Sequence, residues 1–296
     1  MLSKILKVYN QQEYLYKFYS SETRSKITFM FNTYFNNKPQ QINKINSQFL
    51  EWFIGFTEGD GSFIISHNKV YFDIRQNIED IQVLYYIKKN LGFGKIQVRA
   101  EIHRRVAVFF VTSKEHFYRL MLIFNGNLVS NYKSNQFKTW VNAFNNQYSE
   151  NVYFIENKVE PSLSSAWLSG FIDAEGSFTG RVKKCNTSRL KKAPHLALTI
   201  AQKDKIIICK IRKLFFNNNK GLSYDKSWDD WRVQISSFSK LDLVINYLNK
   251  FPLRTKKNIA FIRFKHIHNL IMNKRHLCLE GLNTIESIIK KVNKQD

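Results

Sequence analysis

Two acidic residues, Asp60 and Glu175, lie in nearly identical nine-residue strings, GFTEGDGSF at 55–63 and GFIDAEGSF at 170–178. One such string is typical of a solvated turn. Two copies need a different explanation, because carboxylates brought close together repel each other unless a cation lies between them. Hard oxygen ligands suit Mg²⁺. If the two strings meet in the fold, they predict a magnesium site built on Asp60 and Glu175.

The repeat extends well beyond the acids. A constant offset of 115 residues also pairs Ser47 with Ser162, Trp52 with Trp167, Gly55 with Gly170, Phe56 with Phe171, and Glu58 with Asp173. Farther on, Gln76 aligns with Gln202 and Lys133 with Lys257, and the second copy gains 11 residues in the basic stretch RVKKCNTSRLKKAP. The period is too long for a solenoid, so we infer two copies of one small domain.

The domain boundaries follow from this alignment. We expect an N-terminal extension of unknown role at 1–46, repeats at 47–150 and 163–296, and a linker at 151–162. Each repeat is predicted to contain a helix, two strands, a helix, one or two strands, a helix and closing helices. The fold class is therefore α+β.

The first helix of each repeat carries the acid at its C-terminal end. In PSLSSAWLSGFIDAEG the apolar residues recur at helical spacing after Ser162, which is a good N-cap residue. Small residues four apart allow close helix contact, and we expect the two helices to pack together about a pseudo-twofold axis through Gly55, Gly59, Gly170 and Ala174. The alternative is two separate helices, each packed on its own sheet. Glu58 and Asp173 are expected to bond locally within the fold.

The strand sequences alternate between apolar and polar residues. Ile96 and Val98 are expected on the covered face of a sheet, and Ala197 and Thr199 on the other face. An uncovered, cation-rich antiparallel sheet can enter the major groove of DNA, where side chains reach base edges. The alternative is a merely solvated face. The side chains that we expect to contact DNA are Lys69, Arg75, Lys95, Gln97, Arg99, Thr179, Arg181, Lys183, His195, Arg232 and Gln234.

Composition restricts the choice of partner. The 296-residue chain has 46 Lys and Arg against 23 Asp and Glu, a net charge of +23, so nucleic acid is the first candidate partner. No run approaches the roughly 18 apolar residues of a membrane-spanning helix, and we expect no membrane partner. The cysteines at 185, 209 and 278 lack paired spacing, and the C-terminal histidines are not expected to bind zinc. The excess of Asn, Lys, Ile, Phe and Tyr suggests an AT-rich genome, such as that of an organelle.

The strings FIGFTEGDG at 53–61 and LSGFIDAEG at 168–176 resemble the defining motif of LAGLIDADG homing endonucleases, in the monomeric form with two repeats. The resemblance implies two αββαββα halves whose sheets form a DNA-binding saddle. It also implies that Asp60 and Glu175 bind the catalytic metals with the backbone carbonyls of Gly59 and Ala174, assisted by Gln76, Gln202, Lys133 and Lys257. In the first copy NLVSNYK lacks the Pro and the Lys-Lys pair of FPLRTKK, which is a departure around Lys133.

The implied function is site-specific double-strand cleavage of DNA at a long asymmetric target, leaving short 3′ overhangs and promoting intron mobility. Mg²⁺ is the expected cofactor, Mn²⁺ is expected to substitute, and the expected location is the mitochondrion. An alternative is an RNA maturase that binds its host intron and assists splicing, which would not require both acids. A third possibility is a DNA-binding regulator, in which one acid is usually replaced. The retention of both acids favours the nuclease.

Overall fold

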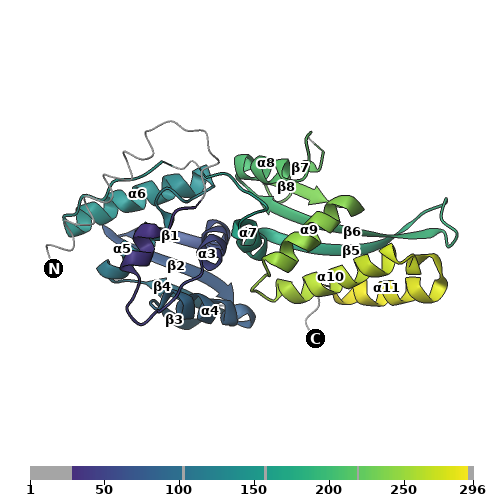
Figure 1. Ribbon diagram of the computed structural model, residues 1–296, viewed down its shortest axis with the longest axis horizontal. Coiled ribbons are helices and arrows are strands. Elements are labelled where there is room, and N and C mark those ends of the chain that lie inside the picture. Colours follow the sequence, from purple (N-terminus) through teal and green to yellow (C-terminus); the bar gives the residue numbers. More distant parts are fainter. Residues whose placement is uncertain (1–28, 102–103, 157–158, 219, 293–296) are drawn as a thin grey trace. The chain divides into compact units, whose positions relative to one another are not determined.

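The computed structural model describes residues 29–101, 104–156, 159–218 and 220–292. The chain divides into two compact units at the boundary between Pro161 and Ser162, and the ribbon is drawn in Figure 1. None of the helices in these ranges is long and apolar enough to cross a bilayer.

The first unit contains one four-stranded antiparallel sheet in the order β1-β2-β4-β3. Its strands are β1 (Gly61–Ser66), β2 (Lys69–Asn77), β3 (Lys95–Glu101) and β4 (Arg104–Val111). Its helices are α2 (Asn32–Asn37), α3 (Ser47–Asp60), η1 (Ile78–Asp80), α4 (Ile81–Leu91), α5 (Lys114–Phe124) and α6 (Asn131–Tyr148). The stretch from α3 to α5 thus has the expected αββαββα order.

The second unit repeats this arrangement with the sheet order β5-β6-β8-β7. Its strands are β5 (Gly176–Lys184), β6 (Lys192–Gln202), β7 (Leu222–Asp225) and β8 (Asp230–Ile235). Its helices are α7 (Trp167–Glu175), α8 (Lys205–Lys213), α9 (Phe238–Lys250), α10 (Lys257–Met272), η2 (Arg275–Leu277) and α11 (Leu279–Lys291). The extra residues of this copy lie where we expected them, because the β5–β6 hairpin continues to the pair formed by Lys184 and Lys192.

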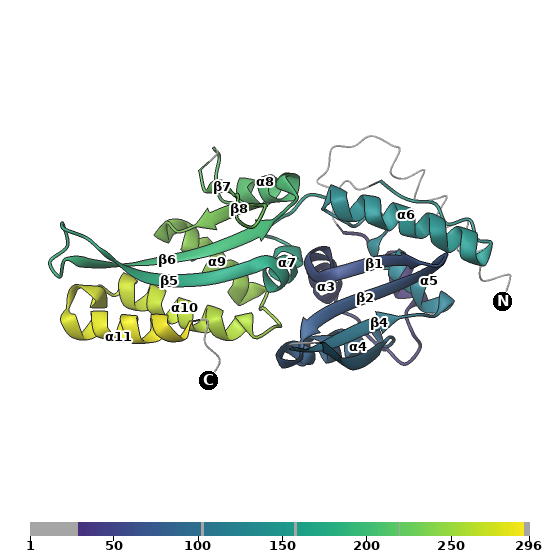
Figure 2. The same ribbon diagram turned by 180° about the vertical axis from the view of Figure 1, so that it is seen from behind.

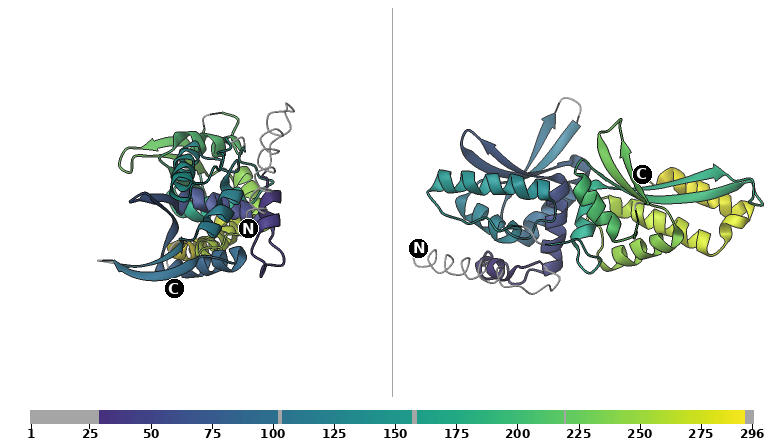
Figure 3. Two further views of the ribbon diagram at one scale, coloured as in Figure 1. Left: turned by 90° about the vertical axis from the view of Figure 1, so that its left-hand side faces the viewer. Right: turned by 90° about the horizontal axis from the view of Figure 1, so that it is seen from above.

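Within each unit the helices cover one face of the sheet and leave the other face open, as Figures 2 and 3 show. The phenylalanine that ends each GSF string lies at the centre of the covered face. Phe63 has its ring centroid 5.1 Å from that of Phe137 and 5.6 Å from that of Trp140. In the second unit Phe178 lies 5.6 Å from Phe261 and 5.2 Å from Phe264. The two cores are therefore built on equivalent aromatic contacts.

The helix that precedes the second acid begins later than expected. Ser162 precedes a turn in which it accepts a hydrogen bond from the Ser165 amide, and α7 starts only at Trp167, so Ser162 is not its N-cap. The cap comes from another helix. The buried Tyr247 hydroxyl of α9 accepts from the Ser169 amide at 2.8 Å and donates to the Ser165 carbonyl at 2.8 Å. A tertiary contact thus supplies the hydrogen bonds that a local cap would have made.

Two residues lie on the expected strand faces but differ in exposure from what their faces imply. Val98 is 40% exposed although it shares the face of Ile96, and its strand β3 is an edge strand. Ala197 is 1% exposed although it pairs with the exposed Thr179 on the open face, because its small methyl group lies on the central strand β6.

Residues 29–46 pack against the first unit. The buried Asn127 side chain accepts from the Met30 amide at 2.9 Å and donates to the Met30 carbonyl at 2.8 Å. Arg119 of α5 donates to the Asn37 carbonyl at 3.0 Å. Tyr34 is fully buried, which raises the pKa of its hydroxyl. This part of the N-terminal segment therefore contributes to the core of the unit.

A glycine directly follows each acid, and its missing side chain is a steric requirement. A Cβ at Gly176 would lie 2.7 Å from the Ile172 carbonyl oxygen, and a Cβ at Gly61 would lie 2.9 Å from that of Thr57. Both glycine amides donate to these same carbonyls and so close the helix. The chain can pass directly from helix to strand only because no side chain is present here.

We expect Gly176→Ala to lower the free energy of unfolding by about 1–3 kcal/mol, because rigid backbone must move to admit the methyl group. The control is Gly180→Ala on the same strand, where the new Cβ would meet only the side chains of Ile289 and Leu196. Thermal and urea unfolding of both variants measure the difference. Equal stability of the two variants would contradict the steric account.

Candidate functional site

Each acid is held by the glutamine aligned with it. Gln76 Nε2 donates to Asp60 Oδ2 at 2.7 Å, and Gln202 Nε2 donates to Glu175 Oε1 at 2.7 Å. The glutamines lie at the ends of β2 and β6. Each of these strands pairs antiparallel with the strand that directly follows the acid, β1 or β5, and its end therefore returns to the acid. The sequence alignment therefore identified residues that meet in the same way in both units.

The point where each acid-bearing helix passes into the next strand, at Asp60–Gly61 and at Glu175–Gly176, is called the junction. The two aligned lysines also reach these junctions, from α6 and α10. Lys133 Nζ donates to the Gly61 carbonyl at 2.5 Å, whereas Lys257 Nζ donates to the Ala174 carbonyl at 2.6 Å. The carbonyl that accepts from the lysine thus belongs to the residue after the acid in the first unit and to the residue before the acid in the second. Although the sequence around Lys133 departs from that around Lys257, Lys133 still extends to the helix end.

Buried carboxylates two residues before the acids hold the segments that carry these lysines. Glu58 Oε1 accepts from the amides of Val129 at 2.8 Å and Ser130 at 2.6 Å. Val129 and Ser130 are the last two residues before α6, and Ser130 Oγ in turn accepts from the Lys133 amide. Glu58 is 2% exposed, so these are charge-assisted hydrogen bonds in a dry environment.

Asp173 makes the corresponding contacts in the second unit. It accepts from the Arg254 amide at 2.7 Å and from the Thr255 amide and hydroxyl at 3.1 and 2.6 Å. Thr255 Oγ1 then accepts from the Lys257 amide. Glu58 and Asp173 do bond within the fold as expected, but their partners are not local, because they lie 71 to 82 residues farther along the chain. These partners fix the start of the lysine-bearing helix.

The helix ends suit a cation. A carboxylate and backbone carbonyls lie together at each helix C-terminus, where the helix dipole already favours positive charge, and the lysine ammonium groups occupy positions against these carbonyls. Oxygen donors of this kind match Mg²⁺. The Ala174 carbonyl would have to share its oxygen between the metal and Lys257. Within the described ranges no group of three His, Cys, Asp or Glu residues is arranged so that it could hold a metal ion, and each of these helix ends offers one acid with its carbonyls.

The open face of the first sheet bears exposed cations. Arg75 is oriented by Asp73, whose Oδ2 lies 3.1 Å from both Nε and Nη2 of the guanidinium. Lys95, Gln97 and Arg99 are exposed on β3, and Arg99 donates to Gln97 Oε1 at 3.3 Å. Lys69 is exposed at the start of β2.

The open face of the second sheet is more polar. Thr179, Arg181 and Lys183 are exposed along β5. His195 of β6 pairs with Arg181 across the sheet. Partial burial lowers the pKa of His195, and the charges of Lys183 and Arg181 lower it further, so this imidazole favours its neutral form.

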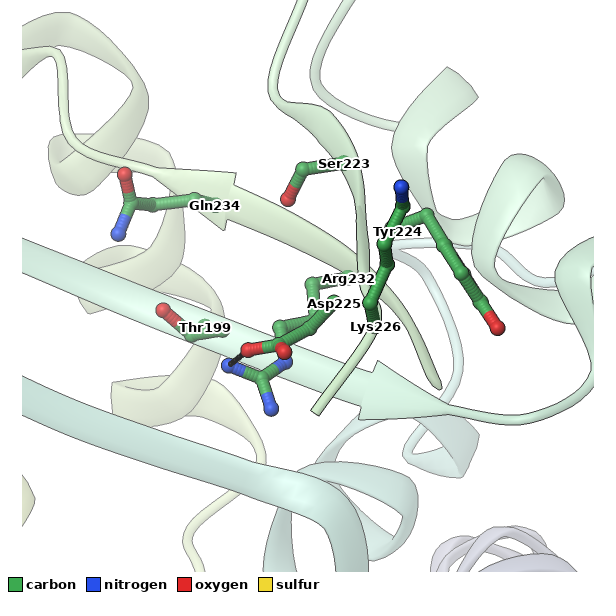
Figure 4. Close-up of a pocket in the computed structure, with 7 residues that line it drawn as sticks. All are labelled: Thr199, Ser223, Tyr224, Asp225, Lys226, Arg232 and Gln234. Atoms are coloured by element: carbon green, nitrogen blue, oxygen red, sulfur yellow. Dashed lines mark ion pairs between the residues drawn. The ribbon is translucent and has the colours of Figure 1, made fainter. Parts of the chain in front are cut away.

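Strands β6, β7 and β8 form a polar pocket of about 350 Å³, drawn in Figure 4 and lined by Thr199, Ser223, Tyr224, Asp225, Lys226, Arg232 and Gln234. Arg232 is held by two carboxylates: its Nη1 lies 2.7 Å from Asp225 Oδ2, and its Nε lies 2.6 Å from Asp230 Oδ1. The sequence interpretation included Arg232 and Gln234 but missed these two acids. The alternate spacing of Asp230 and Arg232 on one strand face is the signal that could have identified Asp230.

The strand register shows which positions of the two sheets correspond, and the open faces differ at some of these positions. Gln76 pairs with Ala107 and Gln202 pairs with Trp231, so Arg232 corresponds to Val108 of β4. Val108 is buried, whereas Arg232 lines the pocket. The two units therefore present different chemistry from the same backbone arrangement.

Comparison with known proteins agrees with this geometry. The profile of the LAGLIDADG endonuclease family matches residues 53–144 and 168–268, together well over half of the chain and once in each unit. The chain belongs to the LAGLIDADG endonuclease family. Both motif acids of this family member, Asp60 and Glu175, fall within the matched ranges.

Relatives of this family member occur among intron-encoded proteins. It is 38% identical over 253 residues to a probable intron-encoded endonuclease 4 of Neurospora crassa, covering 84% of this chain and 45% of that protein. It is 22% identical over 263 residues to the intron-encoded RNA maturase bI4 of Saccharomyces cerevisiae, covering 84% of this chain and 39% of the maturase. The chain thus spans less than half the length of these two relatives.

Solved structures share the fold. The meganuclease I-AabMI bound to uncleaved DNA has a TM-score of 0.69 at 21% identity, covering 83% of this chain and 99% of that one. I-SmaMI, bound to an uncleaved DNA target in the presence of calcium ions, has a TM-score of 0.63 at 18% identity, covering 85% of this chain and 100% of that one.

We expect Asp173→Asn to destabilise the second unit by roughly 2–4 kcal/mol, because the amide group turns a hydrogen-bond donor toward the Arg254 or Thr255 amide. The control is Glu286→Gln in the same unit, an isosteric change at the surface ion pair with Lys192, which contributes little to stability. Hydrogen exchange should show faster exchange of the Arg254 and Thr255 amides in Asp173→Asn alone. Unchanged protection of these amides would rule out the proposed restraint.

Proposed function

We propose that this protein is a site-specific DNA endonuclease that makes a double-strand break and promotes the mobility of the intron that encodes it. The duplicated junction carries this proposal: in each unit an acid at a helix end is held by a glutamine and approached by a lysine. Two equivalent centres match a substrate with two antiparallel strands to cut.

The proposed assembly brings the two junctions together. Helices α3 and α7 pack through Gly55, Gly59, Gly170 and Ala174, so that Asp60 and Glu175 lie near a pseudo-twofold axis and both open sheet faces turn toward DNA. The repeated order of elements and the likeness to DNA-bound meganuclease folds support it. One chain supplies both halves, so the active form is a monomer.

Each residue of the junction has a defined task in this proposal. Asp60 and Glu175, with the carbonyls of Gly59 and Ala174, would hold Mg²⁺, and Mn²⁺ would substitute for it. The bound metal supplies Lewis-acid activation of water and neutralises charge at the phosphate. Gln76 and Gln202 orient the carboxylates through their hydrogen bonds. Lys133 and Lys257 place positive charge where the phosphate gains negative charge during hydrolysis. The two proposed cuts would leave short 3′ overhangs.

Asp60→Asn or Glu175→Gln should reduce double-strand cleavage by at least about 100-fold while leaving DNA affinity largely intact, because only the metal-holding charge is removed. Glu286→Gln, an isosteric change at the surface ion pair with Lys192, is the control. Each protein is incubated with a library of intronless organellar gene sequences and Mg²⁺, and the DNA ends produced are then sequenced. Cleavage of both strands at the original rate by either acid variant would refute the assignment.

We further propose that Arg75 and Arg232 read base edges in opposite half-sites, since each guanidinium is oriented by a carboxylate on an open sheet face. Arg99, Arg181, Gln97, Gln234, Thr179 and His195 would contribute contacts beside them, and Lys69, Lys95 and Lys183 would engage phosphates. With roughly 6–10 phosphate contacts, DNA affinity would fall by about 10³–10⁵ between 50 and 200 mM salt.

Arg75→Ala and Arg232→Ala should each lose about 1–3 kcal/mol of base discrimination, in different half-sites. Lys69→Ala is the comparison: it should weaken binding to all sequences alike and reduce the salt slope by about one. Binding to a set of single-base target variants at several salt concentrations measures both effects. A uniform effect of the arginine variants would place these side chains on phosphates instead.

RNA maturation is the second candidate function, favoured by the similarity to a yeast intron-encoded RNA maturase over 84% of this chain. Equal affinity for the target DNA and for the host intron RNA, with no cleavage of DNA, would support it. A mitochondrial location is proposed because relatives include a yeast mitochondrial protein, RF1, at 24% identity.

A further inference from the structure

The hairpin between β7 and β8 carries an exposed tryptophan. Trp228 is 71% exposed, whereas Trp52, Trp140 and Trp167 are at most 3% exposed. The fifth tryptophan, Trp231, is half-buried, with Lys205 Nζ 4.0 Å from its ring centroid. A large aromatic ring left in water is typical of a contact surface.

The hairpin lies at the catalytic end of the second sheet. Trp231 pairs with Gln202, and Gln202 holds Glu175. Trp228 is three residues before Trp231, in the turn that joins β7 to β8. DNA positioned for cleavage at Glu175 would therefore pass close to this hairpin.

The hairpin is held rigidly by its own side chains. Asp225 accepts from the Ser227 amide at 2.9 Å and from its hydroxyl at 2.5 Å. The Tyr224 hydroxyl donates to Asp229 at 2.6 Å across the turn. These hydrogen bonds restrict the backbone of the turn before any contact is made, which lowers the entropy cost of binding through the tip.

The tip carries charges of both signs. Asp225, Asp229 and Asp230 belong to the hairpin region, Arg232 and Lys203 are paired with them, and exposed Lys226 lies two residues before Trp228. Lys226 can engage a phosphate group, whereas an indole ring attracts the flat faces of nucleobases. Charge and ring at this tip therefore suit different parts of the same nucleic acid, and the base is the partner for Trp228.

We propose that Trp228 packs against a nucleobase near the cleavage centre and holds the DNA locally unstacked there. This inference rests on the proposed endonuclease function and adds a positioning residue to it. The occupant is a base of the double-stranded target in the half-site that the second unit contacts. Aromatic wedges of this kind open base steps and bend DNA in other protein–DNA complexes.

The first test uses the fluorescence of the protein itself. In the free protein acrylamide quenching should come chiefly from Trp228, and Trp228→Phe should remove it. Addition of the target duplex recovered by the cleavage experiment, with the Asp60→Asn variant to keep it intact, should protect Trp228 from quenching. Trp228 remaining quenchable in the bound complex would overturn the proposal.

The second test separates stacking from charge. Trp228→Ala should weaken target binding about 10- to 100-fold without changing the salt slope, and Trp228→Phe should retain most of the affinity. Lys226→Ala, at the same hairpin, should alter the salt slope instead. Equal binding by Trp228→Ala and the original protein, or protection of Trp228 by intron RNA but not by DNA, would refute the inference. Failure of the original protein to cleave any DNA would refute the endonuclease function, a separate outcome.

Discussion

The buried carboxylate two residues before each helix end is the interaction on which the arrangement of the site depends. Glu58 and Asp173 each bind backbone amides that precede a distant helix, and that helix carries the lysine of the site. An ionised group is tolerated in a dry core only when hydrogen bonds replace its hydration. Because these amides donate hydrogen bonds to the buried carboxylate, the same contact both compensates the carboxylate charge and fixes the lysine-bearing helix relative to the acid.

A second constraint acts at the next residues along the chain. The acid must end a helix while the following residue begins a strand, and only glycine fits against the carbonyl four residues earlier. The phenylalanine two positions later then anchors the strand in the aromatic core. The short motif therefore combines chemistry, steric fit and packing, and none of these parts can change without disturbing the others.

Duplication has left the two units alike in machinery and different in surface. The junctions share their glutamine contact at the same distance. The open sheet faces differ, since a buried valine in one unit occupies the place of a pocket-lining arginine in the other. Divergence of this kind suits the asymmetric DNA target that we propose, because the proposed cleavage chemistry is the same on both strands whereas base sequence is not.

Much of this organisation could be read from the sequence, because the repeat aligns acids, glutamines and lysines and because alternating strands reveal an open polar face. The order of helices and strands followed from the same periodicities. The sequence could not identify Tyr247 as the cap of α7, because that contact depends on how distant segments pack. It did not identify Asp225 as a partner of Arg232, because that pair depends on the register of the β7–β8 hairpin. Nor could it give the exposure of Ala197 and Val98, since exposure depends on which strand is central and which lies at the edge. Local patterns determined the elements and the chemical groups, and tertiary packing decided which of those groups meet.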